Sequence, residues 1–462
     1  MNKMSVESWT AVSPQSEQQL VSVSQPAPKL TPQAVLRHAH GKPRFFWQDA
    51  SIEQNHEPVV YAAFGIAANL NAWGQNRFLI IQEKAAQLFK DAYFNDAPAW
   101  VETRLFGGFS FRDDFAPDNT WSIYHPAQFV LPHFQLTQKA TETWLTVNAL
   151  IGLDESPHEM VEALQMALDE LMLSVDDMPL EGETAVSMPT IQYPMPFDIW
   201  AKNINEAVHL MKTTELNKVV LSRICELKFE QSIDIENGLN YLLKTYPDCY
   251  TFLFEPRPGH AFIGATPELL ARVNGRKLTT MGLAGSVARG QTEAEAQQFA
   301  AQLRNSQKDQ HEHKLVVDAM RERLIPLTES RHIPTEPDVL RFSNIQHLYT
   351  PIEATLNNDD GILPLIEQLH PTPALGGSPR PMAMSFIKQS EPVPRGWYAA
   401  PIGTLTPTLD GAFGVAIRSA AIQDRRAWLY AGAGMVADSD PELEWDETEL
   451  KFKPMKNALG VE

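Results

Sequence analysis

Apolar residues recur along the first 150 residues in short runs that have the length and alternation of β-strands. Glycine, proline, asparagine and aspartate separate these runs, and few helical patterns interrupt them. Short strands at close intervals indicate an antiparallel sheet, because antiparallel neighbours need only short connections. The predicted strands are Arg44–Trp47, Val59–Ile66, Leu105–Phe111, Phe129–Pro132 and Glu142–Val147.

Apolar residues spaced three and four positions apart predict amphipathic helices. The clearest helix covers 197–213, and others are predicted at 73–97, 157–173 and 307–324. The segment 174–190 is acidic, contains proline and has no periodicity, which is typical of a connection between lobes. We therefore expect an N-terminal lobe at 34–190 and a C-terminal region at 191–462. Residues 1–33 are rich in Ser, Gln and Pro and lack an apolar signal segment, so we expect a disordered leader there.

Two segments of small residues are predicted to be loops. Gly282–Ser286 could bring backbone N–H groups against an anion, and Ala431–Gly434 reads as a glycine-rich turn before a helix. Ser439 is expected to cap that helix, with Pro441 in its first turn. Glu444, Glu447 and Lys451 then share one helix face and could form half of a metal-and-anion site. The alternative is an ordinary surface helix with solvated charges.

Charge and composition exclude several classes of partner. The net charge of -19 disfavours nucleic acid and anionic membrane surfaces, which both require basic patches. No apolar run approaches the roughly 20 residues that cross a bilayer. Only Cys225 and Cys249 occur, so a disulfide framework is excluded and a reducing cytoplasm fits. No sequence feature indicates an interface, so we expect a monomer without an obligate protein partner.

Four charged residues in the second half stand in contexts that suit catalysis. Lys218 opens an apolar strand and would be a base only as a neutral amine; a solvated strand end is the alternative. Glu268 stands among apolar residues, where a carboxyl group can stay protonated, or else it begins a helix. Glu312 could contribute one oxygen to Mg²⁺. Arg418 ends a strand and could grip a carboxylate, or it could be an ordinary surface arginine.

A zinc site at His311-Glu312-His313 is rejected. Alternate residues of a helix point to different faces, unlike the i, i+4 histidines of zinc-binding helices.

The ordered set of motifs resembles the chorismate-utilising enzymes, a family that includes isochorismate synthases, salicylate synthases and the large subunit of anthranilate synthase. The motifs are Lys-Val-Val-Leu-Ser-Arg from residue 218, Gly-Ala-Thr-Pro-Glu-Leu-Leu from 264, Leu-Ala-Gly-Ser from 283, Lys-Asp-Gln-His-Glu-His from 308, Ala-Gly-Ala-Gly from 431 and Glu-Trp-Asp-Glu-Thr from 444. The resemblance is strong from residue 197 onward and looser before 190, where Leu105–Phe109 is its clearest part. It implies an α+β fold with two large antiparallel sheets, flanking helices and an active site in the cleft.

The resemblance also implies residue roles. Lys218 matches the lysine that activates water, and Glu268 matches the acid that protonates the departing C4 hydroxyl of chorismate. Glu312 and Glu447 match Mg²⁺ ligands, and Glu444 stands beside them and acts through water. The remaining matched positions contact the substrate or the metal site, and they are Gly285, His347, Tyr398, Arg418, Gly432 and Lys451.

Two positions discriminate among the family's reactions. Aminodeoxychorismate synthases carry a lysine nucleophile where Ala284 stands, so water is favoured here as the nucleophile. Salicylate and anthranilate synthases usually have Thr-Val where this chain has Ala374-Leu375, and the Ala-Leu pair resembles isochorismate synthases. The resemblance thus implies an isochorismate synthase that serves menaquinone or siderophore synthesis, the N-terminal lobe slightly favouring menaquinone. The alternatives are a salicylate or anthranilate synthase-like lyase and a catalytically dead chorismate-binding protein.

Overall fold

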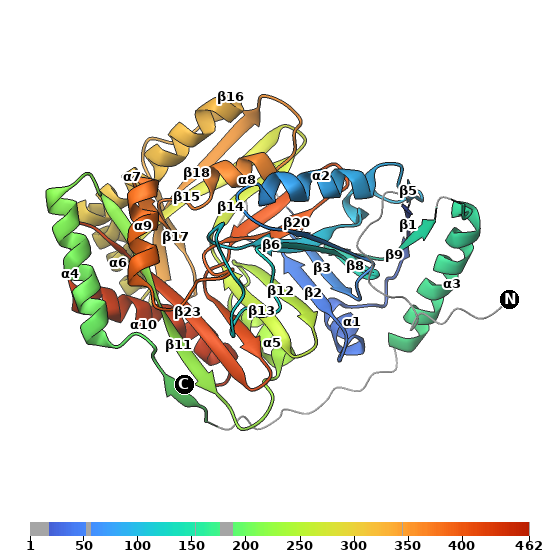
Figure 1. The fold of residues 1–462 in the computed structure, drawn as a ribbon, viewed down its shortest axis with the longest axis horizontal. Coiled ribbons are helices and arrows are strands. Elements are labelled where there is room, and N and C mark those ends of the chain that lie inside the picture. The colour runs from blue at the N-terminus through green and yellow to red at the C-terminus, as the bar shows by residue number, and fades with distance from the viewer. Residues whose placement is uncertain (1–17, 52–56, 153, 176–187, 344, 462) are drawn as a thin grey trace.

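The computed structural model describes residues 18–51, 57–152, 154–175, 188–343 and 345–461. Within these residues most strands join one of two large, mostly antiparallel sheets (Figure 1). The predicted α+β fold with two such sheets is therefore confirmed. No helix in the described part of the chain is long and apolar enough to cross a membrane.

The larger sheet has the path β10-β11-β23-β22-β13-β12-β2-β3-β8-β9-β1-β5, and β19 pairs with β11 beside this path. Its strands are β1 Gln18–Pro26, β2 Arg44–Gln48, β3 Val59–Phe64, β5 Tyr93–Phe94, β8 Phe134–Lys139, β9 Glu142–Gly152, β10 Thr190–Gln192, β11 Lys218–Lys228, β12 Tyr250–Arg257, β13 His260–Thr266, β19 Gly377–Ser378, β22 Ser419–Gln423 and β23 Arg426–Met435.

The smaller sheet has the path β16-β18-β15-β14-β21-β20-β6-β7-β4, and β17 pairs with β18. Its strands are β4 Ala68–Ala72, β6 Leu105–Phe109, β7 Ala127–Leu131, β14 Leu269–Asn274, β15 Lys277–Ala288, β16 Thr328–His332, β17 Asp338–Arg341, β18 Ile345–Leu356, β20 Pro401–Leu405 and β21 Gly411–Val415.

Helices lie around the sheets (Figure 1). They are α1 Pro32–His38, α2 Arg77–Phe89, α3 Pro157–Val175, α4 Phe197–Thr213, α5 Ile235–Thr245, α6 Glu293–Asn305, α7 Gln307–Leu324, α8 Leu363–Leu369, α9 Arg380–Ser390 and α10 Pro441–Ala458. The helices predicted at 197–213 and 307–324 match α4 and α7. The predicted helix at 73–97 is shorter, because α2 ends at Phe89 and β5 follows it.

Strand β2 is apolar on both faces because each face packs into a different hydrophobic core. Phe45 and Trp47 point into a core shared by both sheets, whereas Phe46 points into a second core. That second core also contains buried residues of α1, α3, α5 and α10, which cover the outer face of the larger sheet. The first core therefore joins the two sheets, and the second holds helices against one of them.

The expectation of a disordered leader up to residue 33 is wrong from residue 18 onward. Gln18–Pro26 pairs with Trp144–Gly152 in nine register positions as β1. Leu20, Val21 and Val23 are fully buried. The Val-Ser-Val-Ser alternation is a half-buried strand pattern that the polar composition of the segment concealed. Residues 1–17 lie outside the described residues.

The sequence division near residue 190 does not separate the two sheets. The larger sheet places β2 beside β12, and the smaller sheet places β6 beside β20. Each sheet thus contains strands from both halves of the chain, and the N-terminal strands complete sheets that the C-terminal strands begin.

Both predicted glycine-rich loops are strands, so that prediction is wrong. Gly282–Ser286 lies within β15 and pairs with β18, with an irregularity between Ala284 and Ser286. Ala431–Gly434 lies within β23 and pairs with Leu221–Arg223 and Val220 of β11. The small residues have another function in these ladders, because they leave room above the strands for the side chains described below.

Candidate active site

A cavity of about 240 Å³ lies where β11 and β23 of the larger sheet face β15 and β18 of the smaller one. Its volume is below the roughly 300–1,000 Å³ that is usual for drug-sized ligands, so it suits a small metabolite. The cavity brings together most residues that the sequence singled out. These are Glu268, Gly285, Glu312, His347, Ala374, Leu375, Tyr398, Arg418, Gly432, Glu447 and Lys451.

Lys218 lies immediately behind the cavity wall. Its side chain is buried, and Nζ donates to Oε1 of Glu312 at 2.8 Å. A Cβ atom at Gly434 would lie 2.8 Å from this Glu312 oxygen and 3.1 Å from Cε of Lys218. Gly434 therefore makes room for the ion pair, which explains a small residue at this point of β23. The alternative of a solvated strand end is excluded for Lys218.

Glu268 is buried between β13 and β14, and it does not begin a helix. Burial raises the pKa of Glu268 to about 8, although the positive charges of Lys218 and Lys451 act in the opposite direction. At neutral pH the carboxyl group therefore keeps its proton. A proton donor in contact with the cavity is the requirement for a general acid.

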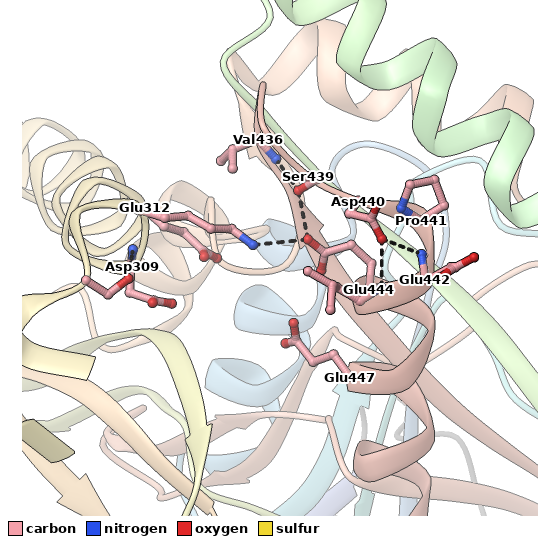
Figure 2. Close-up of polar contacts among 12 residues, drawn as sticks. Asp309, Glu312, Val436, Ser439, Asp440, Pro441, Glu442, Glu444 and Glu447 are labelled. Carbon is pink, nitrogen blue, oxygen red and sulfur yellow. Dashed lines mark hydrogen bonds and ion pairs between the residues drawn. The ribbon is translucent and has the colours of Figure 1, made fainter. Parts of the chain in front are cut away.

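Helix α10 begins after Asp440, whose side chain accepts from the backbone N–H groups of Glu442 and Leu443 (Figure 2). The prediction that Ser439 caps this helix is therefore wrong. Ser439 instead donates from Oγ to Oε1 of Glu444 at 2.8 Å, and it accepts from the backbone N–H of Val436. The hydroxyl thus links the end of β23 to a buried carboxylate on α10.

The carboxylates of the expected metal site each contact a lysine. Glu312 pairs with Lys218 at 2.8 Å, Glu447 with Lys451 at 2.5 Å, and Glu444 with Lys308 at 3.2 Å. Lys451 also donates to the carbonyl oxygen of Gly432 at 2.8 Å. Glu444 is buried and does not line the cavity, whereas Glu312 and Glu447 do.

Like charges are close together at this point of the site. Burial and the charge of Glu447 raise the pKa of Glu444 to about 7. Burial, Glu312 and Glu447 raise the pKa of Asp309, which also lines the cavity. Figure 2 shows Asp309 and Glu312 on one helix opposite Glu444 and Glu447 on another. Such mutual repulsion suits a site that receives a cation. Among the described residues, no group of three or more His, Cys, Asp or Glu side chains is arranged to hold a metal ion, so any ion here would need water or substrate oxygens as further ligands.

Arg418 is a buried arginine that makes no side-chain ion pair or hydrogen bond with any described residue. Burial lowers the pKa of Arg418 below its usual value, but a guanidinium stays charged in proteins. Its backbone has φ of 51°, in the left-handed region that is unfavourable for a residue with a side chain. A buried, strained cation facing a cavity indicates an anionic ligand.

Tyr398 lies beside Arg418 in the cavity wall and stacks on Tyr430, with ring centroids 5.0 Å apart. A Cβ atom at Gly432 would lie 3.2 Å from the hydroxyl oxygen of Tyr398. The glycine therefore leaves this hydroxyl group open to the cavity. Tyr398 and Arg418, which the resemblance places at the substrate or metal site, therefore line one cavity.

His347 forms another part of the wall. Its Nδ1 lies 2.8 Å from Oγ of Ser286, and its buried Nε2 has no hydrogen-bond partner. Burial, together with Arg418 and Lys451, lowers the pKa of His347 well below 6.5, so the ring is neutral. Gly285 precedes Ser286 at φ of 76°, at the irregularity in β15, where a glycine is favoured.

Ala374 and Leu375 are held by a buried ion pair behind the cavity. Arg395 pairs with Glu391, and its Nη1 and Nη2 donate to the carbonyl oxygens of Leu375 and Val220. Both carbonyl-bearing residues line the cavity. The two predicted selectivity positions thus stand on a rigid support.

Histidine at 313 does not serve as a metal ligand. Its Nδ1 donates to the carbonyl oxygen of Ala284, and its Nε2 accepts from the hydroxyl of Thr350. His313 is buried and His311 is exposed, as the rejection of zinc required.

Sequence reasoning missed Lys308, Asp309 and Ser286 as cavity residues. Asp309 precedes Glu312 by three positions on α7 and so shares its face, which was a usable signal. Ser286 stood in a recognised motif but was assigned no role.

The chain is similar to known proteins over nearly its whole length. The family model described as chorismate binding enzyme matches residues 7–460. The chain is 34% identical to isochorismate synthase MenF of Bacillus subtilis, over 96% of this chain and 94% of that protein. It is also 34% identical to the salicylate biosynthesis isochorismate synthase of Pseudomonas aeruginosa, over 91% of this chain and 85% of that protein. The solved structure of MenF from Escherichia coli, described as the menaquinone-specific isochorismate synthase, matches with a TM-score of 0.79 and 25% identity, over 96% of this chain and 95% of that one. The chain therefore belongs to the chorismate binding enzyme family.

Proposed function

We propose that this chain is an isochorismate synthase, which converts chorismate to isochorismate by adding water at C2 and expelling the C4 hydroxyl group. One observation carries the proposal: a single cavity contains a protonated buried carboxyl group, Glu268, and a buried arginine without an anionic partner, Arg418. The relatives named isochorismate synthase, which match nearly the whole chain, support the same reaction.

The cations of the cavity suit a substrate with two carboxylates. Arg418 is free to form two parallel hydrogen bonds with one carboxylate, and Tyr398 supplies a hydroxyl beside it. Lys451, together with a divalent cation held by Glu312 and Glu447, would be available to the second carboxylate. These local charges are needed because the chain as a whole carries a net charge of -19 and repels anions.

The reaction moves one proton to a base and one proton from an acid. Lys218 would take a proton from the attacking water, and Glu268 would give its proton to the departing hydroxyl group, which leaves as water. Each such group is typically worth about 10²–10⁴ in rate. An amine acts as a base only in its neutral form, and the contact with Glu312 is an ion pair of the charged form. Lys218 can therefore act as the base only when Glu312 binds another partner in its place.

We also propose Mg²⁺ as the cofactor, with Glu312 and Glu447 as ligands and Glu444 acting through water. These residues fit the ion, because Mg²⁺ takes one or two carboxylates together with water and substrate oxygens. Their mutual repulsion, seen in the raised pKa of Glu444 and Asp309, supports the same conclusion. When bound, Mg²⁺ would supply positive charge for a substrate carboxylate.

The cavity wall supports water as the nucleophile. Ala284 offers no amine at the position where a lysine would attack the ring. Ala374 and Leu375 are small or apolar, and neither provides a base for eliminating pyruvate.

Salicylate synthase stays the alternative. Menaquinone and siderophore synthesis both stay candidate pathways, because a MenF and a salicylate-biosynthesis relative are each 34% identical to this chain. A monomeric, cytoplasmic enzyme stays our prediction, and the two free buried cysteines fit a reducing compartment.

One assay tests the proposal. Purified protein is incubated with chorismate and Mg²⁺, and the products are separated by chromatography. We expect isochorismate without salicylate or anthranilate. Salicylate as the main product would favour the alternative, and no conversion with intact chorismate binding would indicate a binding protein.

A further inference from the structure

Three lysines neutralise the three carboxylates of the proposed metal site, but they differ in how firmly they are held. The side chains of Lys218 and Lys451 are 1% and 17% exposed, and their contacts are 2.8 Å and 2.5 Å. The side chain of Lys308 is 44% exposed, and its contact with Glu444 is the longest of the three at 3.2 Å. Lys308 is thus the lysine whose ammonium group can move into solvent most easily.

Glu444 needs a cation nearby because its side chain is only 2% exposed. A buried carboxylate without compensation is unfavourable by several kcal/mol. The hydroxyl of Ser439 donates one hydrogen bond, and Lys308 supplies the charge. Glu312 and Glu447 also attract the ammonium group of Lys308, so its charge acts on all three carboxylates. A divalent cation among the same carboxylates would provide the same compensation.

We propose that Lys308 is an internal counter-ion that competes with the divalent cation for the carboxylates around Glu444, and so lowers the affinity of the site for the metal. The proposal rests on the proposed metal site. The ammonium group and the cation exclude each other, because both require the same negative charge and repel one another. Only molecules in which Lys308 has moved away can bind the cation. The measured dissociation constant for the cation is therefore the intrinsic constant divided by the fraction of such molecules.

The expected effect follows from the strength of such a pair. The ammonium group of Lys308 is half-exposed, so solvent screens its charge and the effect of that charge on the metal is modest. Removal of the Lys308 charge should therefore tighten Mg²⁺ binding by about three- to tenfold.

The experiment measures Mg²⁺ binding to the full chain by calorimetry without substrate, so that catalysis plays no part. Lys308→Met removes the charge, and Lys308→Arg keeps it. Lys314→Met is the matched control, since Lys314 is an exposed lysine on the same helix. All three variants change exposed or half-exposed side chains, so the fold is expected to survive, and circular dichroism checks it.

We expect Lys308→Met to bind Mg²⁺ more tightly, while Lys308→Arg and Lys314→Met bind it like the unmodified protein. In a Glu444→Gln background the gain from Lys308→Met should largely disappear, because the shared carboxylate is gone. Equal or weaker binding by Lys308→Met overturns the inference, and so does an equal gain from Lys314→Met. If the unmodified protein binds no Mg²⁺, it is the proposed metal site that fails, and this inference fails with it.

Discussion

Replacement of Glu268 by Gln should abolish turnover while it makes stability less sensitive to pH. Glutamine keeps the shape of the protonated carboxyl group but has no acidic proton to give. Loss of a general acid lowers kcat by about 10²–10⁴, and the fold is expected to persist because the neutral amide suits the buried position. A loss of less than tenfold would contradict the assignment of Glu268 as the acid.

The pH dependence of stability follows from the pKa of about 8 for Glu268, compared with its ordinary value of 4.5. Below 4.5 the group is protonated in both the native and the unfolded chain. Between 4.5 and about 8 only the native state holds the proton, so stability falls as pH rises. Each pH unit in this range is worth about 1.4 kcal/mol, which gives a loss of about 5 kcal/mol as an upper value.

The measurement is urea unfolding of both proteins at pH 5.5 and pH 8. The stability of Glu268→Gln relative to the unmodified protein should increase by several kcal/mol over that range, or about 1.4 kcal/mol per pH unit. Glu336→Gln is the matched control, because Glu336 is exposed, and it should show no such trend. A pH-independent difference for Glu268→Gln would refute the raised pKa.

Three further substitutions test the other parts of the site. Lys218→Ala should lower kcat by at least about 10² with the fold retained on circular dichroism; near-normal turnover would remove Lys218 from the mechanism. Glu447→Ala should weaken Mg²⁺ binding about tenfold or more in calorimetric titration, and an unchanged titration would exclude it as a ligand. Arg418→Met should raise KM for chorismate by about 10² or more. It should not lower Tm, because it removes a buried charge that has no ion-pair partner among the described residues. An unchanged KM would show that Arg418 does not bind the substrate.

Helices were predictable from the sequence where local periodicity and packing agree. The apolar stripe of α4 and the polar start of α7 give bounds that the structure reproduces. The strand β1 was missed because its nine residues, mostly Gln, Ser and Val, resemble a polar tail until β9 supplies a partner. Long-range pairing of this kind leaves little trace in the composition of the segment itself.

The glycines were misread for a different reason. Gly432 and Gly434 suggested a turn, whereas they are strand residues whose missing side chains make room for Tyr398 and for the Lys218–Glu312 pair. A glycine signals either backbone freedom or close approach, and the sequence alone does not distinguish them. The cavity could be assembled from motif order, and Asp309 from its spacing to Glu312, but the contact of Lys308 with Glu444 of α10 required the structure.

The insertion of N-terminal strands into both sheets has a consequence for shortened forms of the protein. A polypeptide of residues 191–462 would expose the edges of β12 and β20, which are eight and five residues long, once β2 and β6 are gone. Open strand edges of buried, apolar residues promote aggregation. Proteolytic removal of the first half should therefore inactivate the enzyme through insolubility, although every residue proposed for the chemistry would still be present.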